Sequence, residues 1–200
     1  MTMSSCVVAK GSALPLFRIT LGGLAFLGAV GTTQAQEGSG GDIVPDDVMS
    51  QKAHGTCPQA VQGDLRWGCD AELADGICCF NRDYAEPSGS WRSTTFLSEE
   101  TGDDGEVTFH DSVTGKVLFR APRGRSFEEF VAESTAHGWP SFRDQEVEWD
   151  AVRVLEGGET VSADGTHLGH NIPDPDGNRY CINLVSIAGN PAEIDAPSRS

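Results

Sequence analysis

One cysteine, Cys181, stands in a short stretch whose residue types favour thiol chemistry. Residues 179–183 are Arg-Tyr-Cys-Ile-Asn. Alternate residues of a β-strand share a face, so Arg179, Cys181 and Asn183 are predicted to point the same way. A neighbouring guanidinium stabilises a thiolate, which is the nucleophilic form of cysteine, and an amide can hydrogen-bond a ligand. The alternative is a buried structural cysteine beside a surface arginine.

Two histidines and a tryptophan upstream are further candidates for a site. His167 and His170 lie three residues apart in Thr-His-Leu-Gly-His. No acidic or thiol residue follows them at the spacing of a zinc site, so acid/base or hydrogen-bonding work is the better interpretation. Trp139 precedes a proline in Gly-Trp-Pro-Ser-Phe. It either packs in the core or forms the wall of a small apolar pocket.

The elements that must position these residues are predicted to be mostly strands. Alternating or continuous apolar residues predict strands within residues 106–113, 116–121, 146–155, 159–164 and 179–187. One helix is predicted between Ser126 and Gly138, because Ser126 and Glu129 match a capping box and Gly138 can end the helix.

The first 35 residues have the pattern of a secretory signal peptide. Lys10 and Arg18 precede an apolar run at residues 19–31, and the small residues Thr33 and Ala35 indicate cleavage after Ala35. The run is shorter than the roughly 20 residues that span a bilayer, although an uncleaved signal anchor is the alternative. Residues 36–50 are predicted to be a flexible leader and residues 193–200 a loose tail. We therefore expect the chain in the secretory-pathway lumen or outside the cell, or in the periplasm if it is bacterial.

Residues 51–92 form a cysteine-rich segment with weak apolar periodicity, predicted to be irregular. An oxidising compartment favours disulfides, and five cysteines beyond residue 35 leave at least one thiol unpaired. Cys78 and Cys79 are neighbours, so pairing each with Cys57 or Cys69 is easier than pairing them together. Two upstream bridges are predicted, with Cys181 left free.

The charge of the chain excludes some partners. Lys and Arg number 14 against 30 Asp and Glu, which gives a formal net charge of −16. Nucleic-acid binding needs a basic surface, and an anionic membrane face would repel this chain. We expect no nucleic-acid partner and no membrane association of the mature form.

Three motifs in order resemble one enzyme family. Gly-Trp-Pro-Ser-Phe, His-Leu-Gly-His and Arg-Tyr-Cys-Ile-Asn, spread over about residues 94–190, are similar to the motifs of type B peptide-methionine (R)-S-oxide reductases, the SelR/MsrB domain. The resemblance implies such a domain over residues 93–192. It also implies a mainly β fold, a barrel-like core of two antiparallel sheets with one or two short helices, here preceded by the cysteine-rich segment.

The resemblance implies a role for each candidate residue. Cys181 would attack the sulfur of methionine-(R)-sulfoxide and become a sulfenic acid, while Arg179 would help to hold the thiolate. The hydrogen-bonding set would be His167, His170 and Asn183, and Trp139 would receive the substrate methyl group. The implied partners are oxidised methionine, free or in peptides, and an external thiol reductant such as a thioredoxin-like protein.

The chain departs from the family in its loops, with a helix before Gly-Trp-Pro-Ser-Phe and a short stretch before Arg-Tyr-Cys-Ile-Asn, and also in its cysteines. Where many members carry four zinc-binding cysteines, this sequence has Asp111, Thr114, Val161 and Asp164, so no zinc and no other cofactor is expected. Where some members have a resolving cysteine, it has His137. Cys78 and Cys79 are then the possible resolving residues, although purely structural bridges are the alternative.

The first hypothesis is thus a secreted reductase that protects proteins against methionine oxidation. Two other classes stay open. One is a non-catalytic extracellular module on the same scaffold that binds peptides or oxidised methionine. The other is a small disulfide-rich interaction protein in which the three motifs occur by coincidence. A stereospecific assay with methionine sulfoxide separates the enzyme from both.

Overall fold

A computed structural model describes residues 43–44, 46–100 and 105–192 of the chain. The expected signal peptide at residues 1–35 and the expected tail at 193–200 lie outside the described residues, as does most of the leader. None of the helices in the described ranges combines the length and the apolar character needed to cross a membrane.

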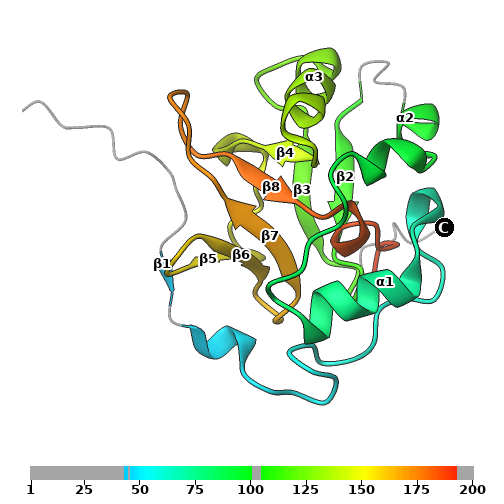
Figure 1. Cartoon of the computed structure of the whole chain (residues 1–200), viewed down its shortest axis with the longest axis vertical. Coiled ribbons are helices and arrows are strands. Elements are labelled where there is room, and N and C mark those ends of the chain that lie inside the picture. The colour runs from blue at the N-terminus through cyan, green and yellow to red at the C-terminus, as the bar shows by residue number, and fades with distance from the viewer. Residues whose placement is uncertain (1–42, 45, 101–104, 193–200) are drawn as a thin grey trace, which may run out of the picture. The chain divides into compact units, whose positions relative to one another are not determined.

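Two β-sheets form the framework of the described part (Figure 1). The larger sheet has the strand order β1 (Ile43–Val44), β5 (Val152–Leu155), β6 (Glu159–Ser162), β7 (His167–Asn171), β8 (Tyr180–Ile182) and β4 (Ser141–Phe142). Every pairing in it is antiparallel except that of β1 with β5. The smaller sheet pairs β2 (Val107–His110) with β3 (Val117–Ala121). The predicted mainly β fold with two antiparallel sheets is confirmed, although the larger sheet stays open between its edge strands.

The helices within the described ranges are few and short. They are α1 (Ala71–Asp75), α2 (Phe96–Glu99) and α3 (Phe127–His137), joined by single helical turns at Asp46–Met49, Arg66–Gly68, Gly76–Phe80, Ser90–Ser93, Asp144–Glu146 and Leu184–Ser186. The predicted helix, α3, begins with the expected capping box. Ser126 Oγ accepts the Glu129 backbone N–H, and the Glu129 carboxylate accepts the Ser126 N–H. Gly138 ends the helix with φ 92°, a left-handed conformation that glycine adopts without strain.

Two predicted strands are shorter than expected. The apolar run at residues 179–187 predicted one strand, but β8 covers only Tyr180–Ile182, and Leu184–Ser186 form a helical turn. The apolar alternation at residues 146–155 predicted a continuous strand, but β5 begins only at Val152. Asp144–Glu146 form a helical turn instead, and the carboxylate of Glu146 is fully buried against Arg125. This ion pair and the hydrogen bond from the Arg143 backbone N–H to Glu146 favour the turn over an extended chain.

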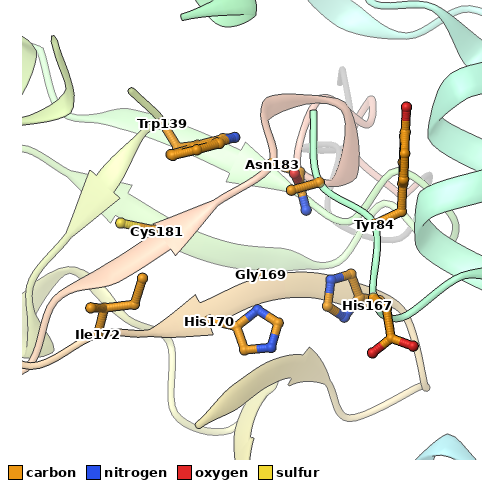
Figure 2. A pocket seen from close by; sticks show the side chains of 10 residues that line it. Tyr84, Trp139, His167, Gly169, His170, Ile172, Cys181 and Asn183 are labelled. Atoms are coloured by element: carbon orange, nitrogen blue, oxygen red, sulfur yellow. The ribbon is translucent and has the colours of Figure 1, made fainter. Parts of the chain in front are cut away.

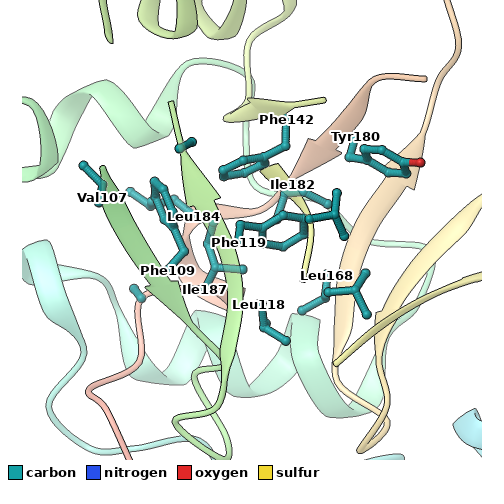
Figure 3. Packing of buried hydrophobic residues seen from close by; sticks show 14 of the residues in the cluster. Val107, Phe109, Leu118, Phe119, Phe142, Leu168, Tyr180, Ile182, Leu184 and Ile187 are labelled. Carbon is teal, nitrogen blue, oxygen red and sulfur yellow. The ribbon is translucent and has the colours of Figure 1, made fainter. Parts of the chain in front are cut away.

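The two sheets are joined by an aromatic core (Figure 3). Phe119 of β3 stacks on Phe142 of β4 with ring centroids 4.3 Å apart, and Phe109 of β2 meets Phe142 edge-on at 5.0 Å. Trp67 and Trp91 of the cysteine-rich segment lie buried in the same cluster. Each large apolar side chain buried in this way contributes about 1.5–3 kcal/mol. The cysteine-rich segment therefore shares its core with the β-sheets.

The prediction of two upstream disulfides is wrong in one respect. Cys57 and Cys79 form a disulfide with their Cα atoms 5.3 Å apart, while Cys69, Cys78 and Cys181 are free. Cys78 and Cys79 lie on one helical turn, Gly76–Phe80, where neighbouring side chains point in different directions. Cys79 faces Cys57, and the Cys78 thiol instead lies 3.4 Å from Ser186 Oγ.

Candidate active site

The motifs meet in one pocket of about 230 Å³ (Figure 2). Its walls come from β7, β8, the segment before β4 and part of the cysteine-rich segment, and they are formed by Asp83, Tyr84, Ala85, Trp139, His167, Gly169, His170, Ile172, Cys181 and Asn183. Five of the six predicted site residues line this pocket. The sixth, Arg179, does not line it but contacts the sulfur of Cys181.

Cys181 lies in the middle of β8 with its sulfur on the pocket side. Its neighbours along the strand, Tyr180 and Ile182, are buried in the aromatic core, as the alternation predicted. The strand is held between β7, where His170 is the cross-strand partner of Cys181, and β4, where the partner is Ser141. Cys181 is 9% exposed, so a small ligand can reach the sulfur from the pocket.

Gly169 allows the two central strands to approach at this point. A Cβ atom built on Gly169 would lie 2.1 Å from the carbonyl oxygen of Cys181, far inside van der Waals contact. Any other residue would push β7 away from β8. The glycine between the two histidines therefore positions both of them against the cysteine strand.

A fixed guanidinium lies beside the Cys181 sulfur. Arg179 Nη1 donates to Sγ over 2.7 Å, and its Nε donates to Asp174 over 3.0 Å. Asp174 also accepts two hydrogen bonds from Arg143, which hold the pKa of that carboxyl well below its usual range. The positive charge next to the sulfur stabilises a thiolate.

His167 is oriented by a carboxylate. Its Nδ1 lies 2.8 Å from Glu159 Oε1, and Glu159 is also paired with Arg82. Burial opposes ionisation of Glu159, but the hydrogen bonds from His167 and Arg82 prevail and lower its pKa to about 2. An ionised carboxylate only accepts, so Nδ1 of His167 carries the hydrogen of this contact.

His170 lies at the mouth of the pocket, and its ring centroid is 5.6 Å from that of His167. Partial burial and, next, the neighbouring His167 lower the pKa of His170 below its ordinary value. The ring is therefore neutral at neutral pH. A neutral imidazole can accept a proton or a hydrogen bond on one nitrogen and donate on the other.

The backbone of Glu86 links two walls of the pocket, a connection that sequence reasoning missed. Trp139 Nε1 donates to the Glu86 carbonyl oxygen over 2.9 Å, and the Glu86 N–H donates to Asn183 Oδ1 over 2.9 Å. Asn183 Nδ2 donates to the carbonyl oxygen of Leu168 over 3.0 Å. Both ends of the Asn183 amide are thus tied to backbone. The segment around Glu86 has no apolar periodicity, so nothing local indicated this role.

The predicted resolving residues do not line the pocket. Cys79 is bonded to Cys57, and Cys78 is fully buried, which raises its pKa well above the ordinary thiol value. Cys69 is half-buried, and its burial together with the charge of Glu86 raises its pKa to about 12. High pKa values leave little reactive thiolate at either free upstream cysteine.

At the positions matched to zinc-binding cysteines, Asp111 and Asp164 make polar contacts, whereas Val161 lies in a hydrophobic cluster. Asp111 is fully buried and accepts hydrogen bonds from the Thr166 hydroxyl and the Val113 N–H. Asp164 pairs with Lys116 at 2.9 Å. These contacts join the β2–β3 hairpin to the turn between β6 and β7. That the protein works without zinc stays a prediction.

Other clusters of potential metal ligands are occupied by protein partners. In the described ranges, His54, Asp75 and Cys79 form one such group, and Glu133, His137 and Asp174 form another. Cys79 is committed to its disulfide, and both carboxylates of the second group are paired with arginine. Neither group lines the pocket.

A β fold that brings a cysteine, two histidines and a tryptophan into one small pocket defines a thiol-based site. A comparison with curated proteins found sequences that are similar to part of this chain. Three are named peptide methionine sulfoxide reductase MsrB. The protein of Methanosarcina mazei is 43% identical over 61 residues, covering 25% of this chain and 43% of the relative. That of Saccharophagus degradans is 38% identical over 84 residues, covering 36% and 62%. That of Leifsonia xyli subsp. xyli is 36% identical over 91 residues, covering 40% and 59%.

The resemblance to the type B reductases is therefore confirmed for part of the chain. The matches span about two-fifths to three-fifths of the length of these relatives. No family model matches the sequence.

Proposed function

We propose that this chain is a secreted, thiol-dependent peptide-methionine (R)-S-oxide reductase in which Cys181 is the nucleophile. The observation that carries the proposal is the 2.7 Å contact of Arg179 Nη1 with the Cys181 sulfur, at the wall of a pocket that also contains Trp139 and two histidines. The similarity to the three MsrB proteins supports the same activity.

The reaction begins with the Cys181 thiolate held beside Arg179. The sulfur attacks the sulfoxide sulfur, the oxygen takes a proton and moves to Cys181, and the thioether leaves as methionine. Cys181 is thereby oxidised by two electrons to a sulfenic acid. His167 and His170 hydrogen-bond the oxygen and relay its proton from solvent, since each has a ring nitrogen that can exchange one.

Trp139 supplies the wall for the methyl group of the substrate. Its indole N–H donates to the Glu86 carbonyl oxygen, which holds the ring at the pocket wall. If the substrate methyl group lies against Trp139 and the sulfoxide oxygen against the hydrogen-bonding residues, only one configuration at the sulfoxide sulfur can face Cys181. The pocket therefore selects one epimer, and the resemblance to the type B reductases implies that it is the R epimer.

The return to the thiol needs two external thiols. The first attacks the sulfenic acid, releasing water and forming a mixed disulfide with Cys181, and the second reduces that disulfide. A thioredoxin-like protein supplies both thiols in one molecule. We also propose that residues 1–35 direct the chain into an oxidising compartment, with which the Cys57–Cys79 disulfide is compatible.

The stereochemical prediction tests the assignment directly. Incubated with dithiothreitol, the protein is expected to consume N-acetyl-methionine-(R)-sulfoxide and to leave the S epimer, which chiral chromatography of the residual substrate measures. Equal consumption of both epimers would exclude the proposed pocket geometry. Binding of the R epimer without turnover would instead support the non-catalytic module.

The recycling prediction concerns the fate of Cys181 without a reductant. After one equivalent of sulfoxide, mass mapping is expected to find a sulfenic acid on Cys181, an intact Cys57–Cys79 disulfide and an unmodified Cys78, because burial keeps Cys78 protonated. The acid is trapped with dimedone. A Cys181–Cys78 disulfide in the same digest would show that the upstream segment resolves the intermediate.

A further inference from the structure

A second hollow lies next to the catalytic pocket and shares one residue with it. It has a volume of about 480 Å³ and is lined by Asp70, Glu72, Leu73, Gly76, Ile77, Phe80, Asn81 and Tyr84. All of these belong to the cysteine-rich segment, which the resemblance does not cover. Tyr84 lines both hollows, and Figure 2 shows it on the side of the pocket away from Cys181.

The exposed apolar side chains of the described residues gather at these two hollows. Three large hydrophobic residues are exposed there: Phe80 at 59%, Tyr84 at 50% and Ile172 at 48%. Phe80 and Tyr84 line the second hollow, and Tyr84 and Ile172 line the catalytic pocket. Apolar groups that stay in water and lie together mark a surface that binds something.

The charges around the hollows have one sign. Asp70 and Glu72 line the second hollow and Asp83 lines the catalytic pocket, while no lysine or arginine lines either. None of the three carboxylates has an ion pair with a described residue. The surface therefore complements a ligand that is apolar and positively charged.

The second hollow is built on a braced element. Asp70 caps α1 by accepting the N–H groups of Glu72 and Leu73. Asp75 at the end of α1 pairs with His54 at 2.8 Å, and the next turn is tied down by the Cys57–Cys79 disulfide. The hollow is thus formed before a ligand arrives, which limits the entropy lost on binding.

We propose that the second hollow is a docking groove for the polypeptide that carries the oxidised methionine, and that it selects an apolar and a basic residue near that methionine. This inference rests on the proposed function, because the methionine sulfoxide would occupy the Cys181 pocket while its flanking residues pass Tyr84. Free methionine sulfoxide is too small to reach the groove. The cysteine-rich segment is then the part of the chain that determines substrate preference.

Two peptides with a single methionine-(R)-sulfoxide test the preference. In the basic peptide the residues that flank the methionine are leucine and lysine. In the acidic peptide they are serine and glutamate. With dithiothreitol as reductant, the basic peptide is expected to have a KM about tenfold lower at equal kcat, because the groove acts on binding. Equal KM values for the two peptides would overturn the docking groove.

Two charge reversals locate the effect. Glu72→Lys alters an exposed residue in the first turn of α1, and Glu128→Lys alters an exposed residue at the same position of α3, away from both hollows. Glu72→Lys is expected to remove most of the tenfold preference, and Glu128→Lys to keep it. Both variants are expected to reduce N-acetyl-methionine-(R)-sulfoxide at the wild-type rate. A similar loss of preference in both variants would assign it to net charge and reject the groove.

A binding measurement separates this inference from the proposed function. Fluorescence anisotropy of the labelled basic peptide with the Cys181→Ser variant reports docking without chemistry. Tighter binding of the basic peptide, weakened by Glu72→Lys, would support the groove even if the wild type reduced no sulfoxide. Reduction of both peptides with no difference in their binding would refute the groove and leave the reductase assignment intact.

Discussion

Replacing Cys181 with serine is expected to lower the rate of methionine-(R)-sulfoxide reduction by about a thousandfold or more, because a serine hydroxyl is not ionised at neutral pH and cannot take up the oxygen as a sulfenic acid. The backbone pairing of position 181 with His170 and Ser141 does not depend on the side chain, so the fold is expected to survive. The measurement is the single-turnover rate with the R epimer.

The matched control for this change is Cys69→Ser. Cys69 is also a free thiol, but it does not line the pocket and it packs beside the aromatic core. This variant is expected to keep the wild-type rate. Loss of activity in Cys69→Ser but not in Cys181→Ser would place the nucleophile in the cysteine-rich segment and reject the proposed mechanism.

The second large effect is expected on stability. Asp111→Ala removes a fully buried carboxyl group that accepts hydrogen bonds from Thr166 Oγ1 and from the N–H groups of Val113 and Thr114. Burial raises the pKa of Asp111, so its hydrogen bonds are not counted as bonds to a charged group. Three donors lose their acceptor, and each buried donor left unsatisfied costs about 1–3 kcal/mol, so the free energy of unfolding is expected to fall by about 3 kcal/mol or more. Urea denaturation measures the change.

Asp164→Ala is the control, since Asp164 is another position matched to a zinc-binding cysteine. Its ion pair with Lys116 is partly exposed to solvent, so this change is expected to cost about 0.5 kcal/mol. Similar losses in the two variants would contradict a special role of the buried carboxyl. One tightly held zinc ion per chain, found by elemental analysis, would overturn the expectation that hydrogen bonds take the place of a metal here.

The local patterns of the sequence were sufficient for part of the fold and of the site. The alternation at residues 179–183 predicted that Arg179, Cys181 and Asn183 share a face, because side-chain direction along a strand depends on the backbone alone. The capping box of Ser126 and Glu129 predicted the start of α3 for the same reason: both partners lie within one helical turn. Three short motifs together indicated the resemblance to the type B reductases.

Contacts between distant segments were decided by tertiary structure. The choice of Cys57 as the partner of Cys79, with Cys78 left free, depends on which way each side chain leaves the helical turn that follows α1. Composition and spacing leave several pairings equivalent, since a loop of any of these lengths can close at similar entropic cost.

The same limit applies to the walls of the pocket. Glu86 joins Trp139 to Asn183 through its backbone, and backbone groups are identical in every residue, so no letter of the sequence indicates such a contact. Tyr84 became part of both hollows because the cysteine-rich segment packs Trp67 and Trp91 into the core of the sheets. The sequence by itself determined which residues can perform thiol chemistry and which face of their strand they occupy. Only the packing of the cysteine-rich segment against the sheets decided which residues surround the thiol site. The hydrophobic effect that drives this packing is non-directional, so the sequence does not indicate which distant segments come into contact.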